Sequence, residues 1–212
     1  MKILIADRFP KNAINQLLAN GFEVVFNHEL INEELAQTIA KTASEILVVR
    51  STLVTAHMLS ATHLKLVIRA GSGTNNIDTE AARLHEVRVS NCSGQNAIAV
   101  AELCFGLILG IDRHIPNNVA ELKKGRWNKA LFSRSQGLYQ RSIGLVGLGY
   151  VGKEMIPRAK AFGMHVLGWS RSLTPAKASQ YGIQQMPTLL ALAKASDIVS
   201  IHIALTQKTQ NF

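Results

Sequence analysis

The stretch SIGLVGLGYVG, residues 142–152, decides the fold of this 212-residue chain. An apolar strand runs into the glycine-rich turn Gly147-x-Gly149-x-x-Gly152, and a segment with apolar residues at helical spacing follows it. A second apolar strand comes next, so the segment predicts a βαβ unit of a parallel, doubly wound sheet. In such a unit the first glycine permits the tight turn, the second lets a ligand approach the backbone, and the third permits close helix packing. The segment therefore predicts a site for a dinucleotide pyrophosphate at the helix N-terminus.

The rest of the chain continues this alternation of strands and helices. Apolar and β-branched runs predict strands at 2–6, 22–26, 46–49, 65–69, 87–90, 143–146, 164–169 and 198–203, and helical spacing predicts helices at 11–19, 32–41, 56–61, 79–85, 96–111 and 153–162. Asn32 and Asn96 are the expected N-caps of their helices. The pattern predicts an α/β fold with two doubly wound parallel sheets, divided near Asn96, and a polar, basic connector at 116–141.

Composition limits the class of protein. A hydrophobic fraction of 47% suits an ordinary globular core. The two cysteines, Cys92 and Cys104, predict no disulfide framework and fit a reducing, cytoplasmic compartment. No N-terminal signal is predicted. The longest apolar run, 97–111, contains Glu102 and is too short to span a bilayer, so it predicts a buried helix.

The charge of the chain is uneven along its length. Residues 1–98 contain nine Lys or Arg and nine Asp or Glu, whereas residues 99–212 contain 14 and 5, so the whole net charge of +9 lies in the second part. These basic residues are scattered and lack an aromatic platform or a recognition motif, which argues against nucleic-acid binding. We expect a solvated surface that attracts anionic cofactors.

Four ordered blocks together resemble one protein family. They are Arg50-Ser51-Thr52, the loop from Arg69 to Asp78 (RAGSGTNNID), the segment from Asn91 to Asn96 that leads into the long helix, and the Gly147 loop. They resemble the D-isomer-specific 2-hydroxyacid dehydrogenases, and the N-terminal half is most similar to the phosphoglycerate dehydrogenases of that family. The resemblance covers the whole chain and implies an oxidoreductase that transfers a hydride between NAD(P) and a 2-hydroxy or 2-keto acid.

The resemblance also implies two domains with separate tasks. Residues 1–96 would form a flavodoxin-like substrate domain, and residues 97–212 a Rossmann dinucleotide-binding domain that lacks its last strands. The full-length form would be a homodimer, and the apolar helix 96–111 could serve its interface or be a core helix.

Five residues are expected at the substrate. Successive backbone N–H groups of a glycine-rich loop form an anion-binding concavity, and Gly71, Ser72 and Gly73 would hold the substrate carboxylate as in the family. Arg50 and Ser51 would lie beside them. The family usually has Asp-Asn where this chain has Asn75-Asn76, so a neutral side chain replaces a carboxylate in this loop.

The cofactor is expected to be NAD(P), with NADP favoured over NAD. An acidic residue normally binds the adenosine ribose at the end of the second strand, but here the segment is Ser170-Arg171-Ser172. With serine in place of the acidic residue, a 2′-phosphate is not repelled at this position, and the arginine can bind that phosphate. The alternative is that Arg171 is a solvated loop residue and the cofactor is NAD.

Further cofactor contacts follow from the same resemblance. Tyr150 and Val151 would lie over the pyrophosphate, and Ile203 would approach the cofactor. His202-Ile203-Ala204 resembles a family segment that has proline in place of Ala204. His202 is expected to be structural rather than catalytic, and the spacing of the other histidines and of the cysteines predicts no metal site.

The catalytic residues of the family are expected to lie beyond Phe212. The family uses an Arg, a Glu and a His from downstream segments, so the resemblance implies an N-terminal part of a dehydrogenase that is inactive alone. The alternative is a short dinucleotide-binding protein without turnover, which acts as a regulatory or interaction protein.

Overall fold

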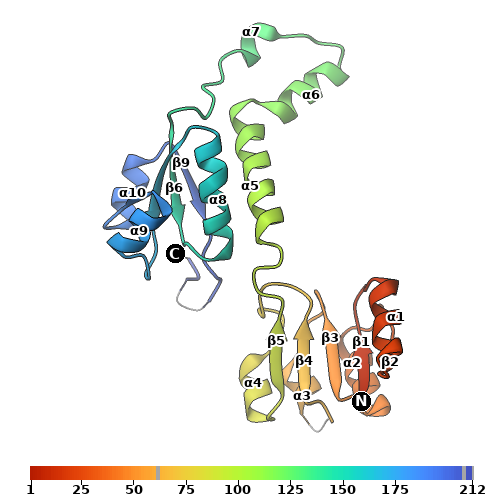
Figure 1. Cartoon of the computed structure of the whole chain (residues 1–212). Helices are drawn as coiled ribbons and strands as arrows, with labels where there is room; N and C mark the ends of the chain where they lie inside the picture. The colour runs from red at the N-terminus through yellow and green to blue at the C-terminus, as the bar shows by residue number, and fades with distance from the viewer. Residues whose placement is uncertain (61–62, 207–208, 212) are drawn as a thin grey trace. The chain divides into compact units, whose positions relative to one another are not determined.

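The computed structural model describes residues 1–60, 63–206 and 209–211. The chain divides into two compact units, Met1–Gln95 and Asn96–Phe212. Each unit is an α/β structure built on one parallel sheet (Figure 1). The prediction of an α/β fold with two parallel sheets is therefore confirmed.

The sheet of the first unit has five parallel strands in the order β2-β1-β3-β4-β5. They are β1 (Lys2–Ile5), β2 (Glu23–Phe26), β3 (Ile46–Val49), β4 (Leu66–Arg69) and β5 (Arg88–Asn91). All residues of the central strand β3 are buried, because helices pack on both faces of a parallel sheet. Since all strands run the same way, the loops that follow them gather at one edge of the sheet.

Four helices cover the two faces of this sheet. They are α1 (Lys11–Ala19), α2 (Asn32–Thr42), α3 (Ala56–Leu59) and α4 (Thr79–Leu84). On one face Leu35, Met58 and Ala81, from α2, α3 and α4, pack against the sheet in one buried cluster. On the other face Ile14 and Leu17 of α1 pack against the remaining strand side chains.

The sheet of the second unit has four parallel strands in the order β8-β7-β6-β9. Its elements are α5 (Ala97–Asp112), α6 (Ile115–Lys123), α7 (Lys129–Phe132), β6 (Ser142–Val146), α8 (Tyr150–Ala161), β7 (His165–Trp169), α9 (Pro175–Tyr181), β8 (Gln184–Gln185), α10 (Leu189–Ala195) and β9 (Ile198–Ile201). The helices α8 and α10 lie on opposite sides of β6 (Figure 1).

Two clusters hold the helices of the second unit to its sheet. Phe105 of α5 and Met155 of α8 share a buried cluster with Ile143 of β6. On the other face Leu192 of α10 packs on the sheet, and it lies so close that a Cβ on Gly144 would overlap its side chain. Gly144 therefore sets the distance between β6 and α10.

Several expectations about the elements were wrong. The segment 116–141 contains helices α6 and α7, because Pro116 lies at the start of α6, where proline is tolerated, rather than breaking it. The N-cap of α2 is Ile31, in extended conformation, so Asn32 is not a cap. The last strand ends at Ile201 instead of residue 203, and residue 61, the expected end of α3, lies outside the described residues.

The apolar helix α5 is only partly buried. One face, with Ala97, Ala101 and Phe105, is covered. The other face exposes Leu103 and Leu107, which are 63% and 58% accessible. No described helix is long and apolar enough to cross a membrane.

Candidate functional site

A cavity of about 320 Å³ lies at the carboxyl end of the sheet in the second unit. The chain runs outward from β6 through β7 to β8 and then crosses back to β9 on the other side of β6. The strand order therefore reverses between β6 and β9, and such a reversal is where open α/β sheets bind ligands. The cavity lies at this switch point.

The cavity brings together residues from three separate parts of the sequence. Its wall consists of Gly147, Leu148, Gly149, Trp169, Ser170, Arg171, Ser172, Ile203, Ala204, Thr206 and Thr209. Six of these are sequence-predicted cofactor residues: Gly147, Gly149, Ser170, Arg171, Ser172 and Ile203. The other predicted residues, Tyr150, Val151 and Gly152, lie next to the wall in the first turn of α8.

Sequence reasoning missed several wall residues. Leu148 and Trp169 adjoin predicted residues and could have been found from their positions in the turn and at the end of the second strand. Thr206 and Thr209 follow β9, and the Thr209 hydroxyl donates to the Ala204 carbonyl oxygen at 2.6 Å. No sequence signal marks this fold-back of the chain onto the glycine loop.

The three glycines of the loop have different geometries. Gly147 has a φ of +90°, which L side chains rarely adopt. A Cβ on Gly152 would overlap the carbonyl oxygen of Gly147. A Cβ on Gly149 would meet nothing within 4 Å. The fold therefore requires glycine at 147 and 152, whereas at 149 the chain alone leaves room for a side chain.

The N-terminus of α8 begins at this loop. Gly149 is at its N-cap and provides no side-chain cap, and the first turn contains no acidic residue. The first amides of a helix lack intrahelical acceptors and carry a partial positive charge. This turn can therefore hold an anionic group such as a pyrophosphate.

The loop after β7 forms a compact hydroxyl- and cation-rich turn. Ser172 donates its backbone N–H to the Ser170 hydroxyl at 3.3 Å, and the backbone N–H of Leu173 donates to the Ser170 carbonyl oxygen at 3.1 Å. Lys177, which sequence reasoning missed, donates from Nζ to the Ser172 carbonyl oxygen at 3.4 Å. Two cations, from Arg171 and Lys177, thus lie at this loop.

His202 directly precedes the wall residue Ile203 and is not itself part of the wall. Its Nε2 lies 2.9 Å from the Ser200 hydroxyl. Its backbone N–H donates to the carbonyl oxygen of Val146 at 2.7 Å. Burial lowers the pKa of the His202 imidazole, which favours its neutral form at pH 7. The backbone hydrogen bond to Val146 thus extends the pairing of this segment with β6, whereas the ring bonds to Ser200 of β9 itself.

In the first unit, Asp7 organises the predicted Arg50-Ser51 segment. One oxygen of Asp7, which follows β1, accepts the backbone N–H groups of Arg50, Ser51 and Thr52 at 2.7, 3.1 and 3.1 Å. Burial disfavours the charged form of Asp7, but these hydrogen bonds outweigh burial and hold its pKa below the ordinary value. Asp7 was missed because it is distant in sequence from the residues it binds.

The glycine-rich loop after β4 is also tied to its neighbours. Arg69 donates from Nε to the Arg50 carbonyl oxygen at 2.9 Å and from Nη1 to the Gly73 carbonyl oxygen at 3.3 Å. Asn91 donates from Nδ2 to the Ser72 carbonyl oxygen at 2.6 Å. The five predicted substrate residues therefore belong to two loops at one edge of the first unit's sheet.

Two features of this loop were not expected. The backbone N–H of Gly71 donates to the Arg69 carbonyl oxygen at 2.8 Å, so it is engaged within the loop. Asn76, where the family usually has Asn after Asp, is buried and donates from Nδ2 to the Thr52 carbonyl oxygen at 2.7 Å. This amide anchors the loop without any charge.

Among the described residues, no group of three or more His, Cys, Asp or Glu is arranged to hold a metal ion.

Comparison with known protein families gives a match over the second half of the chain. Residues 105–212 match the family model described as the D-isomer specific 2-hydroxyacid dehydrogenase, NAD binding domain. This match covers about half of the chain, including the whole cavity described above.

Sequence relatives cover the chain from end to end. D-3-phosphoglycerate dehydrogenase of Methanocaldococcus jannaschii is 38% identical over all of this chain and 40% of its own length. Hydroxypyruvate reductase of Thermotoga maritima is 37% identical over 99% of this chain and 67% of its own length. This chain thus spans about 40% of the length of the phosphoglycerate dehydrogenases that it matches.

Solved structures agree with these relatives. An acyclic imino acid reductase in complex with NADPH and D-Arg has a TM-score of 0.84 at 31% identity, over 99% of this chain and 67% of its own. A 3-phosphoglycerate dehydrogenase of Entamoeba histolytica with bound NAD+ has a TM-score of 0.79 at 28% identity, over 99% of this chain and 64% of its own.

Proposed function

This chain belongs to the family of D-isomer-specific 2-hydroxyacid dehydrogenases, and we propose that it binds NAD(P) and a 2-hydroxy or 2-keto acid as part of such an oxidoreductase. The observation that carries this proposal is the cavity at the switch point of the second unit. It combines the glycine loop, the start of α8 and the Ser170–Ser172 turn. When bound there, the nicotinamide cofactor supplies or accepts the hydride.

We assign each unit a separate task within this function. The strand order of the first unit is that of flavodoxin-like sheets, so residues 1–96 are proposed as a flavodoxin-like substrate domain. Arg50, Ser51 and Gly71–Gly73 would contact the substrate carboxylate. Residues 97–212 are proposed as the Rossmann domain, with Tyr150 and Val151 over the pyrophosphate and Ile203 beside the cofactor.

We propose that the preferred cofactor is NADP(H). Ser170 occupies the place where an acidic residue would bind the ribose hydroxyls of NAD and repel a 2′-phosphate. Arg171 and Lys177 provide positive charge at the same turn, and Ser170 and Ser172 offer hydroxyls. Relatives of this fold have been solved with either cofactor, NADPH in one and NAD+ in another.

Calorimetric titration of the chain with NADPH and NADH tests this proposal. We expect tighter binding of NADPH. Arg171→Ala should weaken NADPH binding about tenfold and leave NADH binding unchanged, because it removes a charge-assisted contact worth about 1.4 kcal/mol. Ser170→Asp should favour NADH, and Lys194→Ala on α10 serves as a charge-matched control. Equal or tighter binding of NADH by the wild-type chain would contradict the NADP assignment.

The polypeptide of residues 1–212 is proposed to bind its ligands without turnover. The resemblance places none of the family's catalytic Arg, Glu and His within these residues. Rate assays with hydroxypyruvate, glyoxylate and 3-phosphoglycerate should show no activity above the blank. Clear turnover of any of the three would show that residues within 1–212 perform the catalytic roles.

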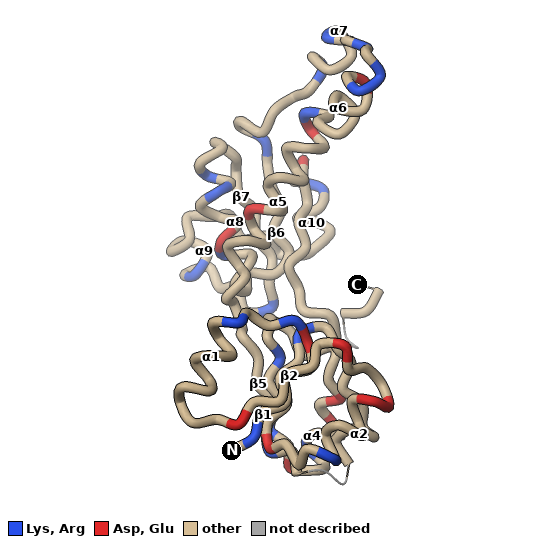
Figure 2. The backbone as a smooth tube through the Cα atoms, turned by 90° about the vertical axis from the view of Figure 1, so that its right-hand side faces the viewer, with Lys and Arg blue, Asp and Glu red and all other residues tan. Residues whose placement is uncertain are grey.

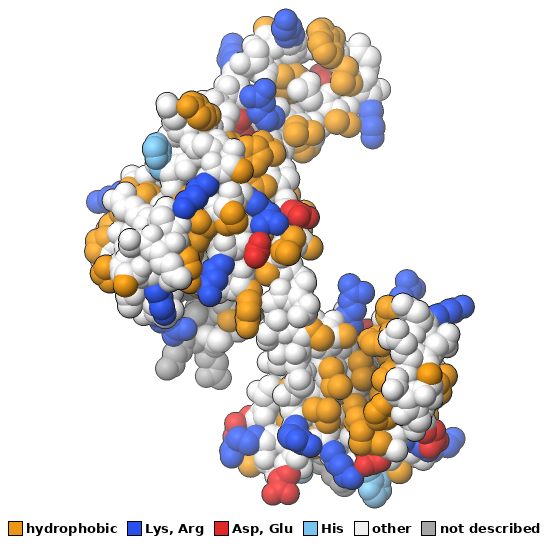
Figure 3. Space-filling model, viewed as in Figure 1, with side chains coloured by type: hydrophobic (Ala, Val, Ile, Leu, Met, Phe, Trp, Pro, Cys, Tyr) orange, Lys and Arg blue, Asp and Glu red, His pale blue; other side chains and the backbone are white. Residues whose placement is uncertain are grey.

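A homodimer is proposed on the exposed apolar surface of α5 and α6. We call this surface the α5–α6 stripe, and it comprises Leu103, Leu107, Ile111, Ile115, Val119 and Leu122, each at least 46% accessible. Large apolar side chains that are exposed together in this number are typical of protein interaction sites. Figure 3 shows further apolar side chains at the surface around α6 and α7.

A further inference from the structure

We propose that Arg69 is a positioning residue that locks the loops 50–52 and 71–73 of the first unit into one preformed carboxylate site. This inference rests on the proposed assignment of these loops to the substrate. Arg69 is the last residue of β4, so its main chain is held by the sheet while its side chain reaches both loops.

The guanidinium group of Arg69 joins loops that follow two neighbouring strands. Its Nε lies 2.9 Å from the carbonyl oxygen of Arg50, after β3. Its Nη1 lies 3.3 Å from the carbonyl oxygen of Gly73, after β4. One rigid planar group therefore fixes the spacing between the two loops.

Gly71 makes this arrangement possible. A Cβ on Gly71 would lie 2.7 Å from Cζ and 2.8 Å from Nε of Arg69. The guanidinium therefore lies flat against the α-carbon of this glycine, in space that any side chain would occupy. The sequence predicted Gly71 as a backbone donor to the substrate, but its N–H is engaged by the Arg69 carbonyl oxygen, and the structure gives its missing side chain a different role.

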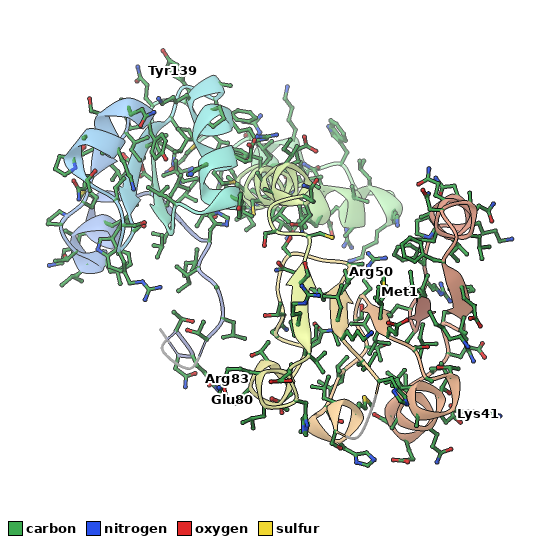
Figure 4. The ribbon with its side chains drawn as sticks, turned by 60° about the horizontal axis from the view of Figure 1, so that its bottom comes forward. Met1, Lys41, Arg50, Glu80, Arg83 and Tyr139 are labelled. Atoms are coloured by element: carbon green, nitrogen blue, oxygen red, sulfur yellow. The ribbon has the colours of Figure 1, made fainter. Side chains whose placement is uncertain are left out.

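The main chain of Arg50 is consequently fixed from two sides. Its N–H donates to Asp7 at 2.7 Å and its carbonyl oxygen accepts from Arg69 at 2.9 Å. The residue itself is exposed, and Figure 4 shows it at the loop end of the sheet. An exposed cationic side chain on an anchored main chain is suited to bind an anion. Because the main chain is already ordered, binding loses less conformational entropy.

Lysine could not replace arginine in this role. Arginine presents donors in a fixed fork, whereas the lysine ammonium is a compact charge on a flexible stem. Arg69→Lys therefore keeps the charge and loses the fixed spacing of the loops. The variant separates positioning from simple electrostatic attraction.

The test is a titration of the ¹⁵N-labelled chain with 3-phosphoglycerate, followed through the amide resonances of Ser51, Gly71 and Gly73. We expect saturable shifts in the wild-type chain and a Kd about tenfold higher in Arg69→Lys, with a thermal midpoint within a few degrees of wild type. Arg83→Lys is the matched control, because Arg83 pairs with exposed Glu80 on α4 (Figure 4). Its Kd should equal that of the wild type.

A second variant distinguishes positioning from a purely structural effect. In Arg69→Ala, millimolar methylguanidinium should restore much of the lost affinity, because the ion can occupy the space against Gly71. Equal Kd values for wild type and Arg69→Lys would overturn the inference and leave the substrate site in place. A wild-type chain that shows no shifts at Ser51, Gly71 and Gly73 would instead remove the substrate assignment, and the positioning role with it.

Discussion

At the scale of single residues, glycine has different physical roles within one short loop. Gly147 is needed for its positive φ, and Gly152 is needed because a Cβ there would overlap the Gly147 carbonyl oxygen. Gly149 is under neither constraint, since a Cβ there would meet open space. The empty space beside Gly149 is explained if a ligand occupies it, because the pyrophosphate of a dinucleotide must approach the backbone at this glycine.

Gly149→Ala should therefore fold normally and bind the dinucleotide poorly. We expect a thermal midpoint close to that of wild type and a Kd for NADPH raised at least about tenfold, because the methyl group occupies ligand space. Thermal melts and calorimetry measure the two effects. Gly152→Ala is the contrasting variant and should lower the midpoint itself. Unchanged NADPH affinity in Gly149→Ala would place the dinucleotide elsewhere.

Asp7 makes the first unit sensitive to acid. Its pKa is lowered in the folded state, so its contribution to stability is complete above the unfolded value, near 3.8, and is lost as pH falls through the folded value. We expect Asp7→Asn to cost about 1 kcal/mol at pH 7 and to flatten the loss of stability below pH ~4. Urea unfolding followed through first-unit amide resonances measures this. Glu86→Gln, at an exposed position, should keep the wild-type acid response.

At the scale of elements, the end of α5 is fixed by one nearly buried carboxylate. Asp112 accepts from the Gly137 N–H at 3.0 Å and from Arg141 Nη1 at 2.9 Å, and its side chain is 8% accessible. It thereby joins the last turn of α5 to the chain that enters β6. Arg141 also approaches Asp197, before β9, at 4.0 Å.

Removal of this carboxylate should destabilise the second unit. Asp112→Ala leaves Arg141 without its main partner, and we expect a loss of about 3 kcal/mol. Both tryptophans, Trp127 and Trp169, belong to the second unit, so their fluorescence reports its unfolding in denaturant. Asp197→Asn should cost less than about 1 kcal/mol, since Asp197 is half-exposed. Equal losses in the two variants would contradict the role given to Asp112.

Elements with a strong local signal were predictable, and those that depend on distant partners were not. The alternation of apolar strands and helices is local, and it gave α1 and β3 with their observed bounds. In the site, the residues of the glycine loop and of the Ser170–Ser172 turn follow from spacing along the chain. Sequence reasoning did not identify the roles of Asp7, Arg69 and Lys177. These roles depend on contacts across strands or turns, and the periodicity of the sequence does not encode such contacts.

At the scale of the whole molecule, charge and apolar surface are distributed unequally. The net charge of +9 belongs to residues 99–212, and Figure 2 shows Lys and Arg along α6 and α7. The α5–α6 stripe lies on the same unit. The α5 residues of this stripe lie on the face of the helix opposite its buried face. In the proposed homodimer, a second copy of the chain would cover the stripe.

Leu107→Glu should therefore shift the chain towards monomer. We expect wild type to sediment with about twice the 23.1 kDa mass of one chain, and the variant near that mass, because a charge in an apolar interface is costly to desolvate. Leu190→Glu, at a similarly exposed site on α10, is the control and should remain dimeric. A wild-type chain that sediments as a monomer at all concentrations would exclude the interface.

Each sheet is built from one uninterrupted stretch of sequence, and this has a consequence for synthesis on the ribosome. All five described strands of the first unit's sheet lie between Lys2 and Asn91, and the described part of the second unit adds no strand to that sheet. At roughly 5–20 residues per second, translation of the rest of the chain takes several seconds. That time exceeds the folding time of most small domains. The first unit can therefore fold before the glycine loop of the second has left the ribosome.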